Sequence, residues 1–190
     1  MRASPYATKQ CRFGDKRLWW FVVLARGKVR FVVMDDNWQQ NGDGIAAFIA
    51  KLPDTLRTML GRGATLPRVI CSDRGPGFYQ SSTGHIVGAY FNAAKQHGFR
   101  PYAGSDASGQ PADIPDVLPH ETAVAWARTY FKKHPVAKGA GVADMERQFR
   151  AILEQCAQHI NAEYDVGGLC KAFPTRLREL IAAEGERLSH

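Results

Sequence analysis

The feature that most constrains the fold is a pair of β-rich runs near the start of the chain. Residues 18–25 and 29–34 are rich in aromatic and β-branched side chains, and only Arg26, Gly27 and Lys28 separate them. Two such runs joined by a short connection that contains glycine are typical of an antiparallel hairpin. We therefore predict a mixed α/β fold with a sheet built on this hairpin and helices covering both faces of the sheet.

Alternating helical and strand patterns follow the hairpin. The predicted elements are a helix over 43–60, a strand over 69–71, a helix over 86–96 and an edge-like strand over 99–102. Asp43 is expected to cap the first helix, and Pro53 to kink or divide it. The run 69–71 is continuously apolar, which predicts a strand that is buried on both faces and lies parallel beside the hairpin.

Three further helices are predicted in the last part of the chain. The first covers residues 120–133 with Pro119 near its start, and the second covers 143–162. The pair 167–168 consists of two glycines, which are expected to interrupt the helical pattern. The last helix is expected after Pro174.

The size and composition of the chain suit one domain with a substantial core. It has 190 residues, of which 45% are hydrophobic and 11% aromatic. The first seventeen residues hold five basic residues against one acid and show no sustained apolar period. We therefore assign residues 1–17 to a basic arm or truncated end, 18–134 to the domain and 135–190 to a C-terminal helical extension.

The cysteines, histidines and apolar runs disfavour three classes of protein: zinc-binding proteins, disulfide-stabilised scaffolds and membrane-spanning proteins. The four cysteines and six histidines show none of the usual zinc-ligand spacings, and the cysteines form no disulfide framework. The longest apolar run, 18–25, is far shorter than a membrane span. We expect a soluble intracellular protein with no membrane partner, located in the nucleus if its source is eukaryotic.

Asp73 is the first candidate functional residue. It follows the apolar run 69–71 and precedes a turn formed by Gly75, Pro76 and Gly77. Ligands of open α/β sheets bind at the carboxyl ends of the strands, so a carboxylate here can face a ligand. Capping of the turn that follows is the alternative role, and aspartate often has it.

Glu121 is the second candidate, in the first turn of the helix predicted over 120–133. Arg128 and Lys132 lie on the same side of that helix. Taken alone, an acid at this position is most simply explained by its favourable interaction with the helix N-terminus. Taken with Asp73, it begins a carboxylate cluster, and hard oxygen ligands of this kind hold two Mg²⁺ or Mn²⁺ ions in phosphoryl transfer.

Three stretches carry longer motifs: SDRGPGF over 72–78, QPADIPDVLPHE over 110–121 leading into Trp126, and AFPTRLRELIAAEG over 172–185. They are similar to DNAPxH, QSPDLNPIExxW and SMPxRxxxVIxAxG of the DDE transposases, in particular the mariner superfamily. The segment 25–34 and the helix that follows it look like the second and third strands and the first helix of the family's RNase H-like catalytic domain.

This resemblance implies an RNase H-like mixed sheet in which Asp73 and Glu121 are catalytic metal ligands for Mg²⁺ or Mn²⁺. It also implies a DNA substrate that is cut and joined at transposon ends. The family's first strand carries a further catalytic aspartate, and no pattern before residue 18 matches that strand. We therefore expect the first strand to be missing and the chain to be incomplete at its N-terminus. Asp15 and Asp36 are the candidates for the remaining metal ligand.

Three functions fit these observations. The first is a partial or degenerate DDE transposase domain, related to two-metal DNA cleavage and strand transfer. The second is a non-catalytic remnant or domesticated module that binds DNA or a protein, and the third is an RNase H-like nuclease. A homodimer is left open. Four basic residues are expected either to contact DNA phosphates or to be ordinary solvated residues: Arg74, Arg128, Lys132 and Lys133.

We predict weak DNA binding without strong sequence preference, because the formal net charge of the chain is +7. Such binding falls steeply between about 50 and 200 mM salt when several phosphates are neutralised. Fluorescence anisotropy of a labelled duplex at low and high salt measures this dependence. Tight binding that persists at high salt would contradict the prediction and indicate an element that reads bases.

Overall fold

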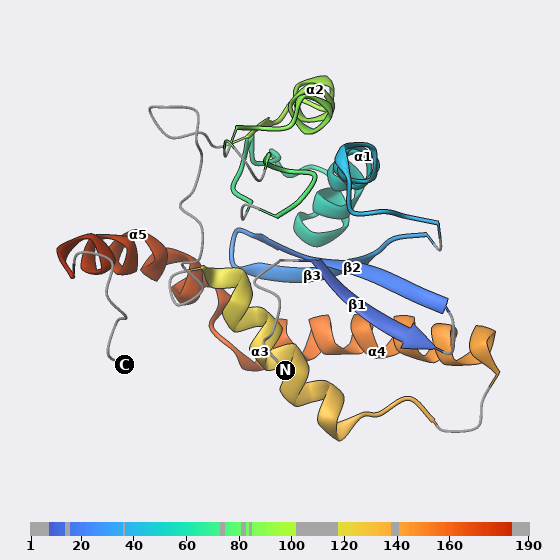
Figure 1. Ribbon diagram of the computed structural model, residues 1–190. Helices are drawn as coiled ribbons and strands as arrows, with labels where there is room; N and C mark the ends of the chain where they lie inside the picture. The colour runs from blue at the N-terminus through green and yellow to red at the C-terminus, as the bar shows by residue number, and fades with distance from the viewer. Residues whose placement is uncertain are drawn as a thin grey trace. The chain divides into compact units, whose positions relative to one another are not determined.

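A computed structural model of the protein describes residues 8–13, 16–35, 37–72, 75–80, 83, 85–101, 118–137 and 141–183, with the backbone alone over 8–13 and 16–17. The elements shown in Figure 1 are, in order, β1 (Thr8–Phe13), β2 (Lys16–Ala25), β3 (Lys28–Val33), α1 (Gly42–Leu60), β4 (Val69–Ile70), α2 (Gly88–Gln96), β5 (Arg100–Pro101), α3 (Pro119–Lys133), α4 (Val142–Glu163) and α5 (Val166–Ala182).

The chain folds into two compact units. Unit 1 contains Met1–Lys9 and Met34–Asp113, and unit 2 contains Gln10–Val33 and Ile114–His190. The hairpin therefore belongs to the same unit as the three C-terminal helices. The predicted boundary after residue 134 does not coincide with a boundary between these units, because α4 packs against β3 and α3 in a shared core.

The structure confirms the predicted hairpin. In unit 2, β2 and β3 pair antiparallel, and Ala25 lies opposite Lys28 next to the turn. Arg26 and Gly27 form this turn with φ values of 48° and 76°. Turns with two positive φ values match the right-handed twist of the flanking strands, and glycine adopts a positive φ without steric cost.

A strand precedes the hairpin, which corrects the sequence prediction. β1 is the neighbour of β2 in a three-stranded sheet of order β1-β2-β3, and β2 itself begins at Lys16. Residues 8–13 and 16–17 are therefore in strands and not in an arm, and the expectation that no strand precedes residue 18 was wrong. The β1 sequence Thr-Lys-Gln-Cys-Arg-Phe has too few apolar residues for a recognisable pattern. A strand at the edge of a sheet can remain polar because its neighbour supplies the hydrogen bonds.

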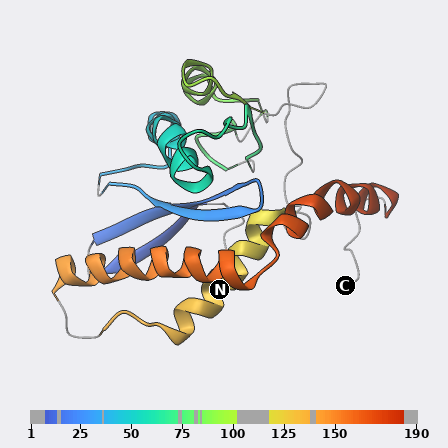
Figure 2. The ribbon, with the colours of Figure 1, turned by 180° about the vertical axis from the view of Figure 1, so that it is seen from behind.

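One face of this sheet is covered by α3 and α4, as Figures 1 and 2 show from opposite sides. The core of unit 2 combines β2, β3, α3, α4 and the start of α5. Its buried residues are Leu18, Trp20, Val29, Phe31, Ala123, Ala127, Phe149, Leu153, Cys156, Ala157, Ile160 and Val166. The apolar residues Phe149, Leu153, Cys156 and Ile160, which fall on one stripe of the helix predicted over 143–162, form the core face of α4, and the predicted helix layer on this face of the sheet is confirmed.

The side-chain amide of Asn161 in α4 pairs with the backbone of Val29 in β3. The Val29 N–H donates to Asn161 Oδ1 (2.8 Å), and Asn161 Nδ2 donates to the Val29 carbonyl oxygen (3.0 Å). β3 is the outer strand of the sheet in the described part of the chain. Unpaired backbone groups at a sheet edge invite pairing with other chains, so Asn161 both ties α4 to the sheet and blocks part of this edge.

The last helix, α5, begins earlier than predicted. Its N-cap is Asp165, whose Oδ1 accepts a hydrogen bond from the Gly168 N–H (2.7 Å). Gly167 and Gly168 lie in the first turn of the helix, which continues through Pro174 to Ala182. A Cβ at Gly168 would collide with the capping carboxylate, so this glycine is part of the cap. The prediction that the two glycines interrupt the helix was wrong.

In unit 1, α1 begins at a cap that the sequence analysis assigned to a different residue. The Asn41 side chain accepts a hydrogen bond from the Gly44 N–H (2.9 Å), and Asp43 lies in the first turn instead. The helix runs through Pro53 without interruption, because the burial of its apolar face outweighs one lost backbone hydrogen bond. The apolar residues of this face recur at helical spacing in the sequence and are buried: Ile45, Phe48, Ile49, Leu52, Leu56 and Met59.

Unit 1 also holds a two-stranded parallel sheet, in which β4 pairs with β5 and α2 lies between them in sequence. Val69 in β4 is 42% exposed, so the prediction of a strand buried on both faces was wrong. The described strands form two sheets, and β4 pairs with β5. The prediction that this strand lies parallel beside the hairpin was therefore wrong.

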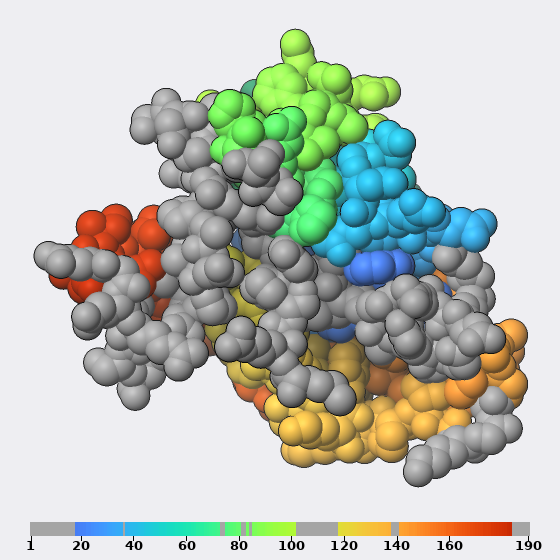
Figure 3. Space-filling view, in the orientation of Figure 1, coloured from blue at the N-terminus to red at the C-terminus, as the bar shows by residue number. Residues whose placement is uncertain are grey.

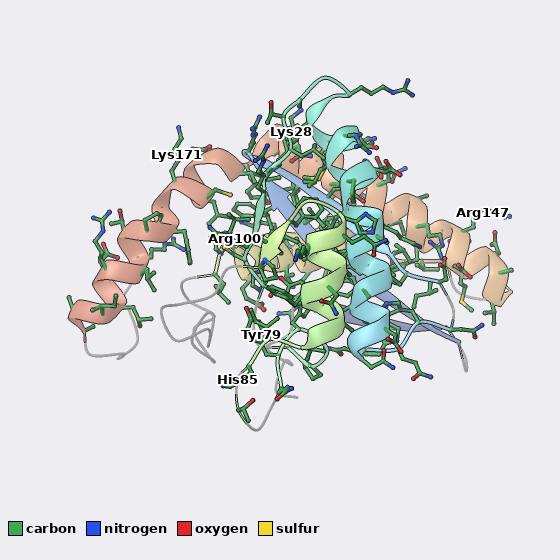
Figure 4. The ribbon with its side chains drawn as sticks, turned by 90° about the horizontal axis from the view of Figure 1, so that it is seen from above. Lys28, Tyr79, His85, Arg100, Arg147 and Lys171 are labelled. Atoms are coloured by element: carbon green, nitrogen blue, oxygen red, sulfur yellow. The ribbon has the colours of Figure 1, made fainter. Side chains whose placement is uncertain are left out.

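In the loop that follows, the Gln80 N–H donates to the His85 carbonyl oxygen (2.8 Å), and Figure 4 shows Tyr79 and His85 close together.

The fold is therefore mixed α/β, as predicted. Within the described residues, helices and short strands alternate after the hairpin, in the predicted order. Among these helices, none combines the length and the apolar character that crossing a membrane requires.

We predict that Asn161→Ala lowers the free energy of unfolding by about 1 kcal/mol, because two hydrogen bonds to a partly exposed strand edge are lost. Asn161→Asp should cost more, since its carboxylate cannot donate to the Val29 carbonyl. Urea unfolding followed by circular dichroism measures both changes. Gln158→Ala, an exposed site on the same helix, is the matched control. Equal midpoints for Asn161→Ala and the control would show that the edge contact contributes nothing.

Candidate functional site

Four of the eight residues singled out from the sequence are described, and all four lie on α3 in unit 2: Glu121, Arg128, Lys132 and Lys133. The other four lie outside the described residues: Asp15, Asp36, Asp73 and Arg74. The structure thus brings one predicted metal ligand and three predicted phosphate contacts onto one helix. A shared site of Asp73 and Glu121 stays a prediction.

The residues at the start of α3 explain why Glu121 lies in its first turn. Leu118 is buried just before the helix, and Pro119 occupies the first helical position, where no N–H donor is needed. The Glu121 N–H donates to the Leu118 carbonyl oxygen (3.1 Å). The buried face of the helix consists of small side chains: Ala123, Val124 and Ala127. Small side chains at a contact let α3 approach β2 and α4 closely.

Glu121 forms a pair with the residue before it. Its Oε1 lies 3.7 Å from His120 Nε2, and the two side chains are only 18% and 14% exposed, respectively. When His120 is protonated, this contact is an ion pair, and partial burial screens it less than a surface pair. The positive end of the α3 dipole also favours the ionised carboxylate. Glu121 is thus a partly buried side chain beside His120 in the first turn of α3.

The three basic residues lie toward the other end of α3, and part of this helix appears in yellow at the surface in Figure 3. Arg128, Lys132 and Lys133 are all exposed, and the structure gives none of them an ion pair with a described residue. At about 1.5 Å per residue, Arg128 is about 10 Å and Lys132 about 16 Å along the helix axis from Glu121. The acid and the basic residues therefore form separate parts of one helix surface.

Five rings that the sequence patterns did not indicate form a group beside these residues, which we call the aromatic ladder: Trp126, Tyr130, His134, His159 and Tyr164. Consecutive rings have centroids 4.4 Å apart for Trp126–Tyr164, 6.0 Å for Tyr164–His159, 5.1 Å for His159–Tyr130 and 4.0 Å for Tyr130–His134. Trp126, Tyr130 and His134 recur at four-residue spacing, with the first two in α3 and His134 directly after its last residue. That spacing was the signal available in the sequence, but the two rings from α4 and its end depend on tertiary packing.

The described thiols do not favour nucleophilic catalysis by cysteine. Burial raises the pKa of Cys71 and of Cys170, and it raises the pKa of Cys156 to about 12. A thiol acts as a nucleophile in its thiolate form, which these shifts disfavour at neutral pH.

The described residues hold part of a metal site at most. The Glu121 carboxylate has the hard oxygen chemistry that suits Mg²⁺ or Mn²⁺. Within the described part of the chain, no group of three or more histidine, cysteine, aspartate or glutamate side chains is placed to hold a metal ion. The other predicted metal ligands, Asp73, Asp15 and Asp36, lie outside that part.

The search of protein-family models and of curated proteins found no match to this chain.

We predict that Glu121→Gln lowers the free energy of unfolding by less than about 1 kcal/mol, the usual range for a charge at a helix N-terminus. The glutamine keeps the size of the side chain and an acceptor oxygen while removing the negative charge. Urea unfolding measures the change, and Glu163→Gln, at an exposed site in the last turn of α4, is the control. A loss of several kcal/mol would instead identify the carboxylate as a structural group and argue against a role in metal binding.

Proposed function

We propose that this chain is a partial or degenerate DDE transposase domain, with an RNase H-like fold related to two-metal DNA cleavage and strand transfer. The observation that carries the proposal is the position of Glu121. The motif that resembles the family's last catalytic acid leads to a partly buried, partly accessible carboxylate in the first turn of a helix.

The order of the elements supports the same proposal. The resemblance requires a strand before the hairpin, and β1 is a strand in that position, next to β2. After the hairpin come α1, β4, α2, β5 and then α3, with β4 and β5 parallel. This order agrees with the hairpin, helix, strand, helix and strand that the sequence patterns predict.

The proposed ligands are Asp73 and Glu121, with Mg²⁺ or Mn²⁺ as the cation. A bound cation of this kind activates a water or 3′-hydroxyl nucleophile and stabilises the leaving oxygen. In the proposal, Glu121 contributes a carboxylate fixed by the start of α3, and Arg128 and Lys132 contact the DNA backbone farther along the same helix. The inclusion of Asp73 among the proposed ligands rests on the sequence motif alone.

We call the proposed domain degenerate because the six residues of β1 include no aspartate or glutamate. Asp15 follows β1 by two residues and is the candidate for the acid expected there, while Asp36 follows β3. Two cations held close together repel each other, so a site short of one carboxylate binds them weakly. The same observation favours the alternative of a non-catalytic module that keeps the fold and binds DNA.

We predict that the chain binds Mn²⁺ and that Asp73→Asn and Glu121→Gln each weaken this binding at least about tenfold, the effect of losing about 1.4 kcal/mol. Glu163→Gln should leave it unchanged. Isothermal titration calorimetry measures the affinity of each variant. The proposal fails if neither Asp73→Asn nor Glu121→Gln changes the affinity for Mn²⁺.

A strand-cleavage assay then separates the active from the degenerate form. We expect no nicking of a transposon-end duplex by the chain with Mg²⁺ or Mn²⁺. Nicking that disappears in Asp73→Asn and in Asp15→Asn would show a complete set of acids and refute the degenerate form. Nicking that requires Asp73 but does not depend on the transposon-end sequence would favour a nuclease.

A further inference from the structure

The end of the aromatic ladder has the geometry of a stacking surface. Tyr130 and His134 form its closest and most parallel pair, with ring centroids 4.0 Å apart and planes 17° from parallel. His134 is exposed and follows the last residue of α3, whereas Tyr130 is half-buried. The imidazole is therefore the outermost ring of the ladder, with one face on Tyr130.

Hydrogen bonds hold this imidazole in place. His134 Nδ1 lies 3.0 Å from the Tyr130 carbonyl oxygen, and the His134 backbone N–H donates to the same oxygen at 3.1 Å. A carbonyl oxygen can only accept, so Nδ1 carries the proton in this contact. A ring fixed by stacking and hydrogen bonding loses little freedom when a ligand binds, which favours binding.

The charges around the ring suit a polyanion. Lys133 and Lys132 directly precede His134, both are exposed, and neither has an ion pair with a described residue. Arg128 lies one turn before Lys132 on α3 and is also exposed. Aromatic faces beside basic side chains are the combination with which proteins bind single-stranded nucleic acids.

We propose that His134, supported by Tyr130, stacks on an unpaired base of single-stranded DNA, while Lys132 and Lys133 contact the adjoining phosphates. The inference rests on the proposed function for the choice of DNA as the ligand. A base inside a duplex has both faces covered by its neighbours, whereas an unpaired base has a face available. The site is therefore expected to select single strands or frayed ends, and it lies about 20 Å along α3 from Glu121.

Anisotropy titrations with three fluorescent probes of equal length test this inference at low salt and without divalent cations. The probes are an oligothymidylate, an oligonucleotide made of abasic sites, and a duplex. Loss of one base stack costs about 1 to 3 kcal/mol, so His134→Ala should weaken binding of the oligothymidylate about fivefold or more. The affinity of the His134→Ala variant for the abasic strand and for the duplex should stay within about twofold of the wild-type affinity.

Matched variants separate stacking from charge and from folding. His134→Phe keeps an aromatic ring and should retain most of the affinity for the oligothymidylate. His85→Ala, at an exposed histidine in unit 1, should change none of the three affinities. The double variant Lys132→Ala/Lys133→Ala should weaken binding of all three probes and lower the dependence on salt.

Two results overturn the inference. One is equal binding of the oligothymidylate by His134→Ala and the wild type, and the other is an equal loss on the abasic strand. Either leaves the proposed function intact if the wild type still binds the duplex and Mn²⁺ binding still depends on Asp73 and Glu121. A wild-type chain that binds no probe and whose Mn²⁺ binding ignores both acids contradicts both proposals. Unchanged affinity of His134→Ala for the abasic strand and the duplex excludes misfolding as the cause of its loss on the oligothymidylate.

Discussion

The packing of α3 and α4 against the β2–β3 hairpin is the interaction on which unit 2 depends. A hairpin alone is only marginally stable in water, and this one buries Leu18 and Trp20 against helices that follow about a hundred residues later. Fully burying a large apolar side chain contributes about 1.5 to 3 kcal/mol. Several such side chains, among them Leu153 and Ile160 of α4, keep the hairpin and the helices together. Asn161 adds a polar contact at the edge of the same interface.

The packing of α3 also determines what its surface offers. Its small buried side chains hold the helix close to β2 and α4, and Leu118 and Pro119 set where it begins. The acid is then at the positive end of the helix dipole and the lysines are at the negative end, where each is electrostatically favoured. These placements stabilise the helix whether or not a ligand binds. The functional proposals therefore rest on the limited exposure of Glu121 and on the rings beside the lysines.

The two proposed roles of α3 use different atoms and different chemistry. A cation at Glu121 needs carboxylate oxygens, whereas stacking at His134 needs an open ring face and nearby positive charge. They are separated along the helix by about 20 Å, so a substitution at one is not expected to disturb the other directly. A strand of DNA that contacts both would run along α3, with its phosphates passing Arg128 and Lys132.

Local patterns in the sequence were sufficient for the hairpin, for the buried faces of α1 and α4, and for the position of Glu121 in α3. Each depends on residues within one or two turns or across one tight connection, as at Gly27 and Pro119. Sequence reasoning failed where the local pattern was weak or indicated the opposite, as in the mostly polar strand β1 and in the glycine pair at the start of α5. β1 is a strand because it pairs with β2, and the helix continues past Gly167 because Asp165 caps it.

In the candidate site, too, some features follow from the local sequence and others from tertiary packing. The sequence by itself determined that an acid and three basic residues share one helix, since helical spacing and a proline near the start are local properties. Only the tertiary structure decided how far Glu121 is exposed and which rings from α4 reach Tyr130. Exposure and ring stacking depend on which segments pack together. The segments that meet here are far apart in the sequence, and no local pattern predicts their contact.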